Sequence, residues 1–350
     1  MPQPNVPIFR HDFVGDTCDP EPLRQANDPP PWREFSKKLG TDGKFVDRFL
    51  NMPADQKRKG SKYKIDREKA LLVDAAILLR RPILVSGYPG VGKTSLAYAI
   101  AWQLGLGRVL RWSITSRSTL EDAQYHYEAI GRLNEAALGK GGVTEGIGNA
   151  NDIGKFITLG PLGTAFLPNG SGPYQPRVLL IDEIDKCDID LPNDLLHLME
   201  EGQFEIREIA RMNNPTGSVT IRTNDGMETQ VPGNGVVTCD DFPIVIMTTN
   251  EERDFSPAFH RRCIRLNMQI PEKLQLEAIV AAHLENTDLL QLPEAQKLIN
   301  EFVNQKNNPE SRISVDRLIN TLHLLSVGRL ASEEDRACIV PAVMGNQTRT

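Results

Sequence analysis

A glycine-rich segment in the first third of the chain has the residue types that bind phosphate groups. Residues 87–94 read GYPGVGKT and fit the pattern G-x-x-x-x-G-K-[ST] at every defined position. Glycine tolerates positive φ angles, so successive backbone N–H groups can turn inward and form a nest for phosphate oxygens. Lys93 is then expected to reach the β- and γ-phosphates of a nucleotide, and the Thr94 hydroxyl to bind Mg²⁺. The predicted nucleotide-binding residues of this segment are Gly87, Pro89, Gly90, Val91, Gly92, Lys93, Thr94 and Ser95.

Two adjacent carboxylates follow a second apolar segment and would complete such a site. Residues 178–181 read VLLI, and Asp182 and Glu183 come directly after them. Ligands of open α/β sheets collect at the carboxyl ends of the strands. Asp182 is expected to bind Mg²⁺ through its water shell, and Glu183 to polarise the attacking water as a general base. Three further aspartates could form a second metal site or cap the next helix: Asp185, Asp188 and Asp190.

A third apolar segment ends in an amide, and a pair of arginines follows it. Residues 243–249 read PIVIMTT and precede Asn250, whose side chain could orient the lytic water against the γ-phosphate. Arg261 and Arg262 lie at the end of a short expected helix, just before a further strand. The pair could be a solvated helix end. In a ring assembly it could instead project into a neighbouring subunit's nucleotide, where an arginine raises the hydrolysis rate about 10³–10⁵-fold.

The segments that carry these residues have the pattern of an α/β fold. Apolar residues recur at helical spacing over 66–80, and three apolar, β-rich runs occupy 82–87, 177–183 and 243–250. Buried strands that alternate with helices are typical of a mainly parallel sheet covered on both faces. After Pro271 the pattern is helical to the end of the chain. We therefore expect an α/β domain followed by a small all-α domain with helices over 274–280, 293–305 and 314–330.

The segment before the first helix is rich in proline and lacks sustained periodicity. Over residues 1 to about 60 we expect an extended arm with a short helix near 44–52. The basic run KRKGSKYK at 57–64 could contact phosphate backbones or be a solvated linker.

Composition limits the classes of function. The 350 residues include 40 basic and 46 acidic side chains, a net charge of −6, so the charge balance makes nucleic acid or an anionic membrane an unlikely partner. The five cysteines include no C-x-x-C pair and indicate reduced thiols instead of a disulfide framework or a zinc site. No apolar stretch reaches the length of a membrane span, and the first residues lack the pattern of a secretory signal. We expect a cytoplasmic protein.

These segments together resemble an AAA+ ATPase of the MoxR group, in particular its CoxD-like branch. The similarity spans about residues 65–330. It is carried by GYPGVGKTSLA (87–97), STLEDAQYHYEAIGRL (118–133), LGPLGTAFL (159–167), LLIDEIDKCDIDLPNDLLHLMEEGQFEI (179–206) and TTNEERDFSPAFHRRC (248–263). The resemblance assigns the Walker A motif to 87–94, the Walker B motif to 178–183 and sensor 1 to Asn250.

The resemblance also implies an arginine finger and a second sensor. The finger lies in the 261–262 doublet, where Arg262 matches the position better than Arg261 does. A second sensor arginine is expected at the start of a helix in the lid. Arg317 is the best match and Arg312 the alternative.

A definite domain organisation follows from the resemblance. A proline-rich arm would occupy 1–61, an AAA+ P-loop NTPase core 62–269, and a helical lid 270–350. The family carries an insertion in the helix after the second strand, for which the glycine-rich residues 134–158 are the counterpart. It also carries a β-hairpin before sensor 1, for which the alternating runs within 202–242 are the counterpart.

For function, the resemblance implies ATP and Mg²⁺ bound between the subunits of a hexameric ring. Hydrolysis would move the lid and the inserted loops and so remodel or mature a protein client, beside a partner with a von Willebrand factor A domain or in a bacterial defence system. Two alternatives stay open: a nucleotide-dependent switch or scaffold with little turnover, and a nucleic-acid-directed ring motor.

Overall fold

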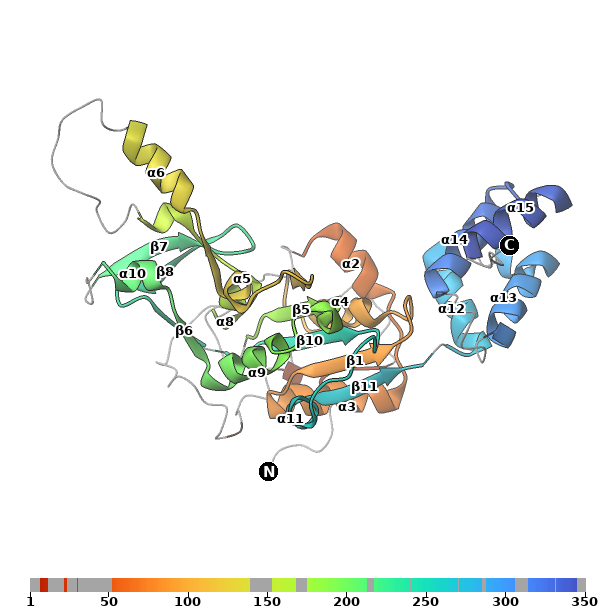
Figure 1. Cartoon of the computed structure of the whole chain (residues 1–350). Helices are drawn as coiled ribbons and strands as arrows, with labels where there is room; N and C mark the ends of the chain where they lie inside the picture. Colours follow the sequence, from red (N-terminus) through yellow and green to blue (C-terminus); the bar gives the residue numbers. More distant parts are fainter. Residues whose placement is uncertain are drawn as a thin grey trace. The chain divides into compact units, whose positions relative to one another are not determined.

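The structure is a computed structural model, and it divides into two compact units (Figure 1). The first contains Met1–Leu84 and Thr94–Leu266, and the second Val85–Lys93 and Asn267–Thr350. The structure describes residues 7–11, 22–23, 30, 52–138, 153–167, 175–212, 217–239, 241–269, 271–284, 288–305, 314–330 and 332–344.

A five-stranded sheet positions the motif residues. Its strands follow the order β11-β1-β10-β5-β2. Their bounds are β1 Ile83–Gly87, β2 Leu110–Ser113, β5 Val178–Asp182, β10 Ile244–Thr249 and β11 Ile264–Met268. β10 and β2 both pair parallel with β5, with Ile246 opposite Leu180 and Trp112 opposite Ile181. Every residue of β5 and β10 is buried, which explains their continuous apolar runs and confirms the expected α/β fold.

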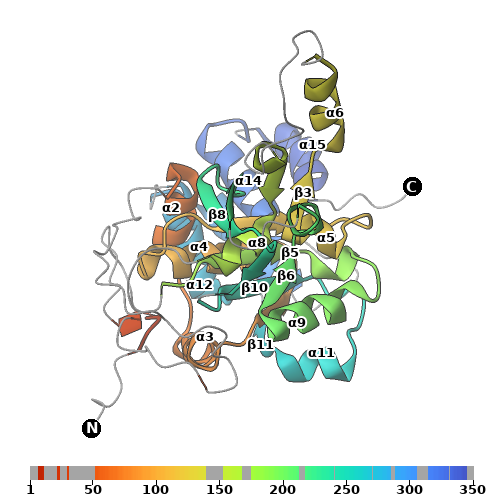
Figure 2. The same cartoon turned by 90° about the vertical axis from the view of Figure 1, so that its left-hand side faces the viewer.

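Helices flank this sheet (Figure 2). They include α3 Arg67–Leu79, α4 Lys93–Gln103, α5 Leu120–Gln124, α8 Pro161–Phe166, η5 Ile184–Lys186, α9 Leu191–Glu201 and α11 Pro257–Arg262. Local signals set their ends. The Asp66 side chain caps α3 by accepting from the Lys69 N–H, and Gly202 ends α9 in the left-handed conformation.

The basic run at 57–64 is not a solvated linker, because most of it is helical and packs on α4. Helix α2 (Ala54–Ser61) approaches so closely that a Cβ at Gly60 would lie 2.4 Å from the Tyr98 carbonyl oxygen. The Lys57 ammonium lies over the Trp102 ring, 4.5 Å from its centroid. Lys57 of this run therefore contacts α4. The helix expected near 44–52 lies, apart from Met52, outside the described residues.

A second sheet carries the segments read as insertions. β7 (Ser218–Arg222) and β8 (Glu228–Pro232) pair in antiparallel register, the hairpin that the alternating pattern predicts. The sheet order is β3-β4-β7-β8, and β6 pairs separately with β9. The remaining elements are β3 Tyr125–Tyr127, α6 Ala129–Leu138, η4 Gly154–Phe156, β4 Ile157–Leu159, β6 Gln203–Glu205, α10 Arg207–Ala210 and β9 Val236–Thr238.

The glycine-rich segment at 134–158 begins in a helix and ends in this second sheet. Helix α6 projects away from the rest of its unit in both views (Figures 1 and 2). Its Ile130 and Leu133 side chains are 76% and 69% exposed. Residues 139–152 lie outside the described part, and Ile157 of β4 is fully buried.

The second unit is helical, which confirms the all-α segment expected after Pro271. Its elements are α12 Lys273–Leu284, η6 Asp288–Gln291, α13 Pro293–Gln305, α14 Val315–Ser326 and α15 Glu333–Met344. Leu276, Ile299 and Leu318 belong to their shared core. The loop before α4 belongs to this unit, because Val91 packs on the same core. Over the described residues, no helix is long and apolar enough to cross a membrane.

Candidate functional site

The loop between β1 and α4 has a backbone conformation that glycine favours. Gly87, Gly90 and Gly92 have φ angles of 142°, 79° and 90°. A Cβ at Gly87 would lie 2.2 Å from the Met268 carbonyl oxygen, so no side chain fits there. Lys93 folds back over the loop, and its ammonium donates to the carbonyls of Gly87 (2.5 Å) and Tyr88 (3.1 Å). The loop thus places the buried Lys93 ammonium beside its glycine-rich backbone, an arrangement that suits an anion site.

Asp182 is the centre of a polar network at the end of β5. Its Oδ1 accepts hydrogen bonds from the hydroxyls of Thr94 (3.1 Å) and Thr248 (2.7 Å). Its Oδ2 accepts from the Arg111 guanidinium at 2.7 Å. Only 7% of Asp182 is exposed, whereas half of the Arg111 side chain is exposed. The structure therefore brings together the two residues expected to bind Mg²⁺ and adds a cation beside them.

Glu183, the expected general base, has an unusual backbone conformation. Its φ and ψ angles of 63° and 51° lie in the left-handed region, which costs a non-glycine residue about 1–2 kcal/mol. Its N–H donates to the Thr248 hydroxyl at 2.9 Å, which fixes this turn against β10. Its carboxylate accepts from the Lys186 ammonium at 2.8 Å, and this hydrogen bond raises the pKa of Lys186. The pair is half-exposed.

The three aspartates after Glu183 have different surroundings. Asp185 is buried, and its Oδ2 accepts from the backbone N–H groups of Asn250 (2.9 Å) and Glu252 (3.2 Å). Asp190 precedes α9, but its side chain makes no capping hydrogen bond. Nor does the described part of the chain contain a group of three or more His, Cys, Asp or Glu side chains placed to hold a metal ion. The described residues thus offer no second metal site, and of the three aspartate side chains only that of Asp188 contacts the start of α9, where its Oδ1 lies 3.5 Å from the Asp190 N–H.

The two arginines at the end of α11 have different surroundings. The Arg262 Nε donates to Glu200 of α9 at 2.8 Å, and both side chains are about 40% exposed. Arg261 is exposed, and its carbonyl accepts from Arg81 at 3.4 Å. Ser256 caps the helix by accepting from the Phe259 N–H. α11 thus presents both guanidinium groups at or near the surface.

Of the two candidates for a second sensor, Arg317 lies in the first turn of α14. This turn faces the glycine-rich loop, because a Cβ at Gly90 would come within 3.0 Å of the Asp316 carboxylate. The Arg317 guanidinium donates to the Met344 carbonyl at 3.2 Å, so in this structure it binds α15. Arg312 lies outside the described residues.

The donor set of the network fits Mg²⁺. Hydroxyl and carboxylate oxygens are the protein ligands that this hard cation takes, and Thr94 and Asp182 supply one of each within 3.1 Å. Thr94 directly follows the glycine-rich loop in the chain. The same short segment can therefore hold phosphate oxygens and one ligand of their counter-ion.

The family of the chain follows from a comparison with known proteins. The model of the ATPase family associated with various cellular activities (AAA) matches residues 83–272, more than half of the chain. The chain belongs to this AAA family of ATPases. A search of curated proteins finds no relative that matches it. Family membership supports a nucleotide-dependent activity for this AAA protein, and the matched range contains the glycine-rich loop, both polar strand ends and the arginine pair.

Sequence reasoning missed two contributors to the site of this AAA protein, Thr248 and Arg111, and assigned a different role to a third, Asp185. Thr248 bridges Asp182 and the Glu183 N–H, Arg111 pairs with Asp182, and Asp185 binds the turn after β10. Thr248 lies two residues before Asn250, which was a usable signal, because consecutive polar residues end an otherwise apolar strand. No comparable signal marks Arg111 in the sequence.

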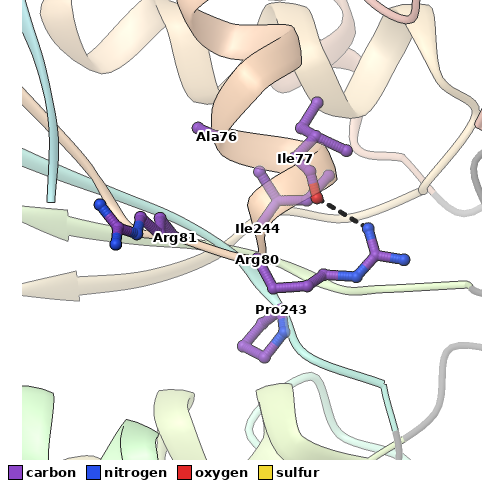
Figure 3. A pocket seen from close by; sticks show the side chains of 6 residues that line it. All are labelled: Ala76, Ile77, Arg80, Arg81, Pro243 and Ile244. Carbon is purple, nitrogen blue, oxygen red and sulfur yellow. Dashed lines mark hydrogen bonds between the residues drawn. The ribbon is translucent and has the colours of Figure 1, made fainter. Parts of the chain in front are cut away.

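A hollow at the other end of β10 is separate from this network (Figure 3). It is lined by Ala76, Ile77, Arg80, Arg81, Pro243 and Ile244. Ile244 begins β10, whereas Asn250 follows its last residue. The Arg80 guanidinium donates to the Ile77 carbonyl of α3 at 2.7 Å.

Proposed function

We propose that this AAA protein is a MoxR-type ATPase that hydrolyses Mg-ATP at sites shared between the subunits of a ring and thereby remodels or matures a protein client. The observation that carries the proposal is the Asp182 network. A threonine that ends a phosphate-binding loop contacts the strand-end aspartate, and the candidate base follows directly. Family membership supports nucleotide use, and the resemblance of the motif stretches is our reason for proposing the MoxR branch.

Each residue has a distinct task in this proposal. The loop N–H groups and the Lys93 ammonium hold the phosphates, and Thr94 and Asp182 hold the metal ion. Bound Mg²⁺ would neutralise charge that develops on the phosphate oxygens. Glu183 accepts a proton from the attacking water, for which its carboxylate has to leave Lys186. Asn250 orients the same water.

The remaining tasks belong to the assembly. Arg262, or its neighbour Arg261, would enter the nucleotide site of the next subunit in a hexameric ring, and Arg317 would sense the nucleotide from the lid. The projecting helix α6 and the β7–β8 hairpin are the parts we assign to contact with the client. A partner with a von Willebrand factor A domain and a cytoplasmic location complete the proposal.

One observation favours a second candidate, a nucleotide-dependent switch with little intrinsic turnover. The Glu183 carboxylate is paired with Lys186, so the base is engaged in this conformation. A protein that stays in this state would bind ATP without hydrolysing it until a partner releases Glu183.

The steady-state ATPase rate as a function of protein concentration tests these candidates. A shared-site ring predicts that the rate per subunit rises with concentration, because assembly completes the sites. Glu183→Gln and Arg262→Ala should each be inactive alone, and their mixture should regain activity, since each supplies what the other lacks. Glu205→Gln, at an exposed position on β6, serves as a matched control. A low, concentration-independent rate with normal ATP binding would favour the switch.

A further inference from the structure

Two short loops at the nucleotide-site edge of the sheet are tied together by side chains outside the ATPase motifs. The first loop, residues 184–188, follows Glu183 and begins with the short 3-10 helix η5, and the second loop, residues 250–253, begins with Asn250. We propose that Asp185 and Arg253 form a clasp between these loops that sets the position of Asn250 relative to Glu183. The catalytic part of this inference rests on the proposed ATP hydrolysis, whereas the clasp itself does not.

Asp185 makes the first half of the clasp. It is 6% exposed, and its Oδ2 accepts from the N–H groups of both Asn250 (2.9 Å) and Glu252 (3.2 Å). Between them lies Glu251, whose φ of 60° is uncommon for a non-glycine residue. One carboxylate oxygen therefore brackets a left-handed residue from both sides. We infer that it holds the turn that follows the sensor position.

Arg253 makes the second half of the clasp, from the loop after β10 to the loop after Glu183. Its guanidinium donates from Nη1 to the Cys187 carbonyl (2.9 Å) and from Nη2 to the Asp188 carbonyl (3.3 Å). A contact of 3.7 Å to the Cys187 sulfur accompanies them. The planar guanidinium suits adjacent acceptors of this kind. Each loop thus contributes one side chain that binds the backbone of the other.

The clasp extends a connection that begins inside the sheet. Thr248 already joins the strand ends, because its hydroxyl donates to Asp182 and accepts from the Glu183 N–H. Asn250 lies two residues beyond Thr248, after the last residue of β10. Glu183 and Asn250 must act on one water molecule from different strands. An error of about 1 Å in such an arrangement can cost about 100-fold in rate.

The chemistry of Asp185 supplies a conservative variant. Its second oxygen, Oδ1, is buried and has no hydrogen-bond partner among the residues described. One acceptor atom thus makes both bonds, and the amide oxygen of Asp185→Asn can replace it. Asp185→Ala removes the acceptor. Asp188→Ala is the matched control, because Asp188 is exposed and its side chain makes, within the described part of the chain, only a 3.5 Å contact to the Asp190 N–H.

Hydrogen exchange in the full-length protein, followed over residues 245–256, tests the clasp without nucleotide. Exchange at Asn250 and Glu252 should accelerate in Asp185→Ala and stay close to wild type in Asp185→Asn and Asp188→Ala. Binding of a fluorescent ATP analogue should change less than about twofold in all three. Single-turnover hydrolysis in Asp185→Ala should fall by up to about 100-fold, since positioning is lost and binding is not.

The possible results separate the two proposals. If both amides keep wild-type protection in Asp185→Ala, the clasp is refuted, whatever the rate of hydrolysis. If they lose it but single-turnover hydrolysis is unchanged, the clasp does not position Asn250. If the wild type binds ATP and never hydrolyses it, the proposed function fails while the exchange result stands. Should Asp185→Ala not fold, Arg253→Ala is measured by the same exchange and hydrolysis assays, and wild-type protection over residues 245–256 in that variant would refute the clasp.

Discussion

The carboxylate of Asp182 has a positive partner within the chain. Arg111 reaches it from β2 at 2.7 Å, while Thr94 and Thr248 bind the other oxygen. A buried carboxylate is costly without such partners. Because the guanidinium is half-exposed and not locked in the core, it can move away when a stronger cation binds. Arg111 and Mg²⁺ should therefore compete for Asp182.

Removal of this competitor should lower the requirement for magnesium. In Arg111→Met the Mg²⁺ concentration for half-maximal ATP hydrolysis should fall by at most about fivefold, because an ion pair whose cation is half-exposed contributes only about 0.2–1 kcal/mol. A magnesium titration at fixed ATP measures the shift. Arg108→Met is the control, because Arg108 is exposed and lies two residues before β2. An increased requirement would show that Arg111 supports the nucleotide site instead of competing with the metal.

A short N-terminal segment is bound to the two helices that flank β1 in the chain. Asp74 of α3 accepts from the N–H groups of Ile8 (3.1 Å) and Phe9 (2.6 Å), and Gln103 of α4 accepts from the Arg10 N–H (3.2 Å). The Ile8 and Phe9 side chains are buried. The segment therefore connects α3 to α4, the helix that begins with the Lys93–Thr94 pair.

The carboxylate that binds this segment makes its stability depend on pH. Burial raises the pKa of Asp74 from 3.8 to about 6, although the two N–H donors lower it in part. Because the pKa is higher in the folded than in the unfolded chain, the stabilisation is complete below pH 3.8 and lost as the pH rises through 6. Acidification from pH 8 to 5 should therefore raise the melting temperature of the wild type relative to Asp74→Asn. A pH-independent difference between the two curves would contradict this.

Helices and strands could be predicted where their signal lies in neighbouring residues of the sequence. Contacts between residues far apart in the sequence could not. The expected helix at 293–305 is α13, and the expected strand at 82–87 is β1 with one residue fewer, because apolar spacing and flanking prolines are local features. The partners of Asp185 and Asp74 are 65 or more residues away in sequence. Such pairs depend on which strand ends and helices become neighbours, and strand order does not follow sequence order. The meeting of Thr94 and Asp182 at the end of β5 thus agrees with what the sequence predicts, whereas the side chains that bind Asp182 and Asp185 from other elements could not be predicted.

The ion pair at the end of α11 bears on how the whole molecule assembles. Arg262 binds Glu200 within its own chain, yet both side chains are about 40% exposed. An exposed pair of this kind contributes about 0–1 kcal/mol, so the arginine can leave Glu200 at little cost. If Arg262 serves the neighbouring subunit, Glu200 is only its resting partner. If Arg262 serves the α9–α11 contact, both residues matter equally.

The two variants of this pair should therefore behave differently. Arg262→Ala should lower the hydrolysis rate by about 10³-fold or more, because the neighbouring site loses its transition-state cation. Glu200→Ala should keep the rate within about twofold and cost at most about 1 kcal/mol of stability. Rates measured at a protein concentration that saturates assembly, with Arg261→Ala beside them, decide which arginine of the doublet acts. Equal losses in Glu200→Ala and Arg262→Ala would mean that the pair only joins α9 to α11, and the cation that completes a shared site would have to come from elsewhere on the subunit.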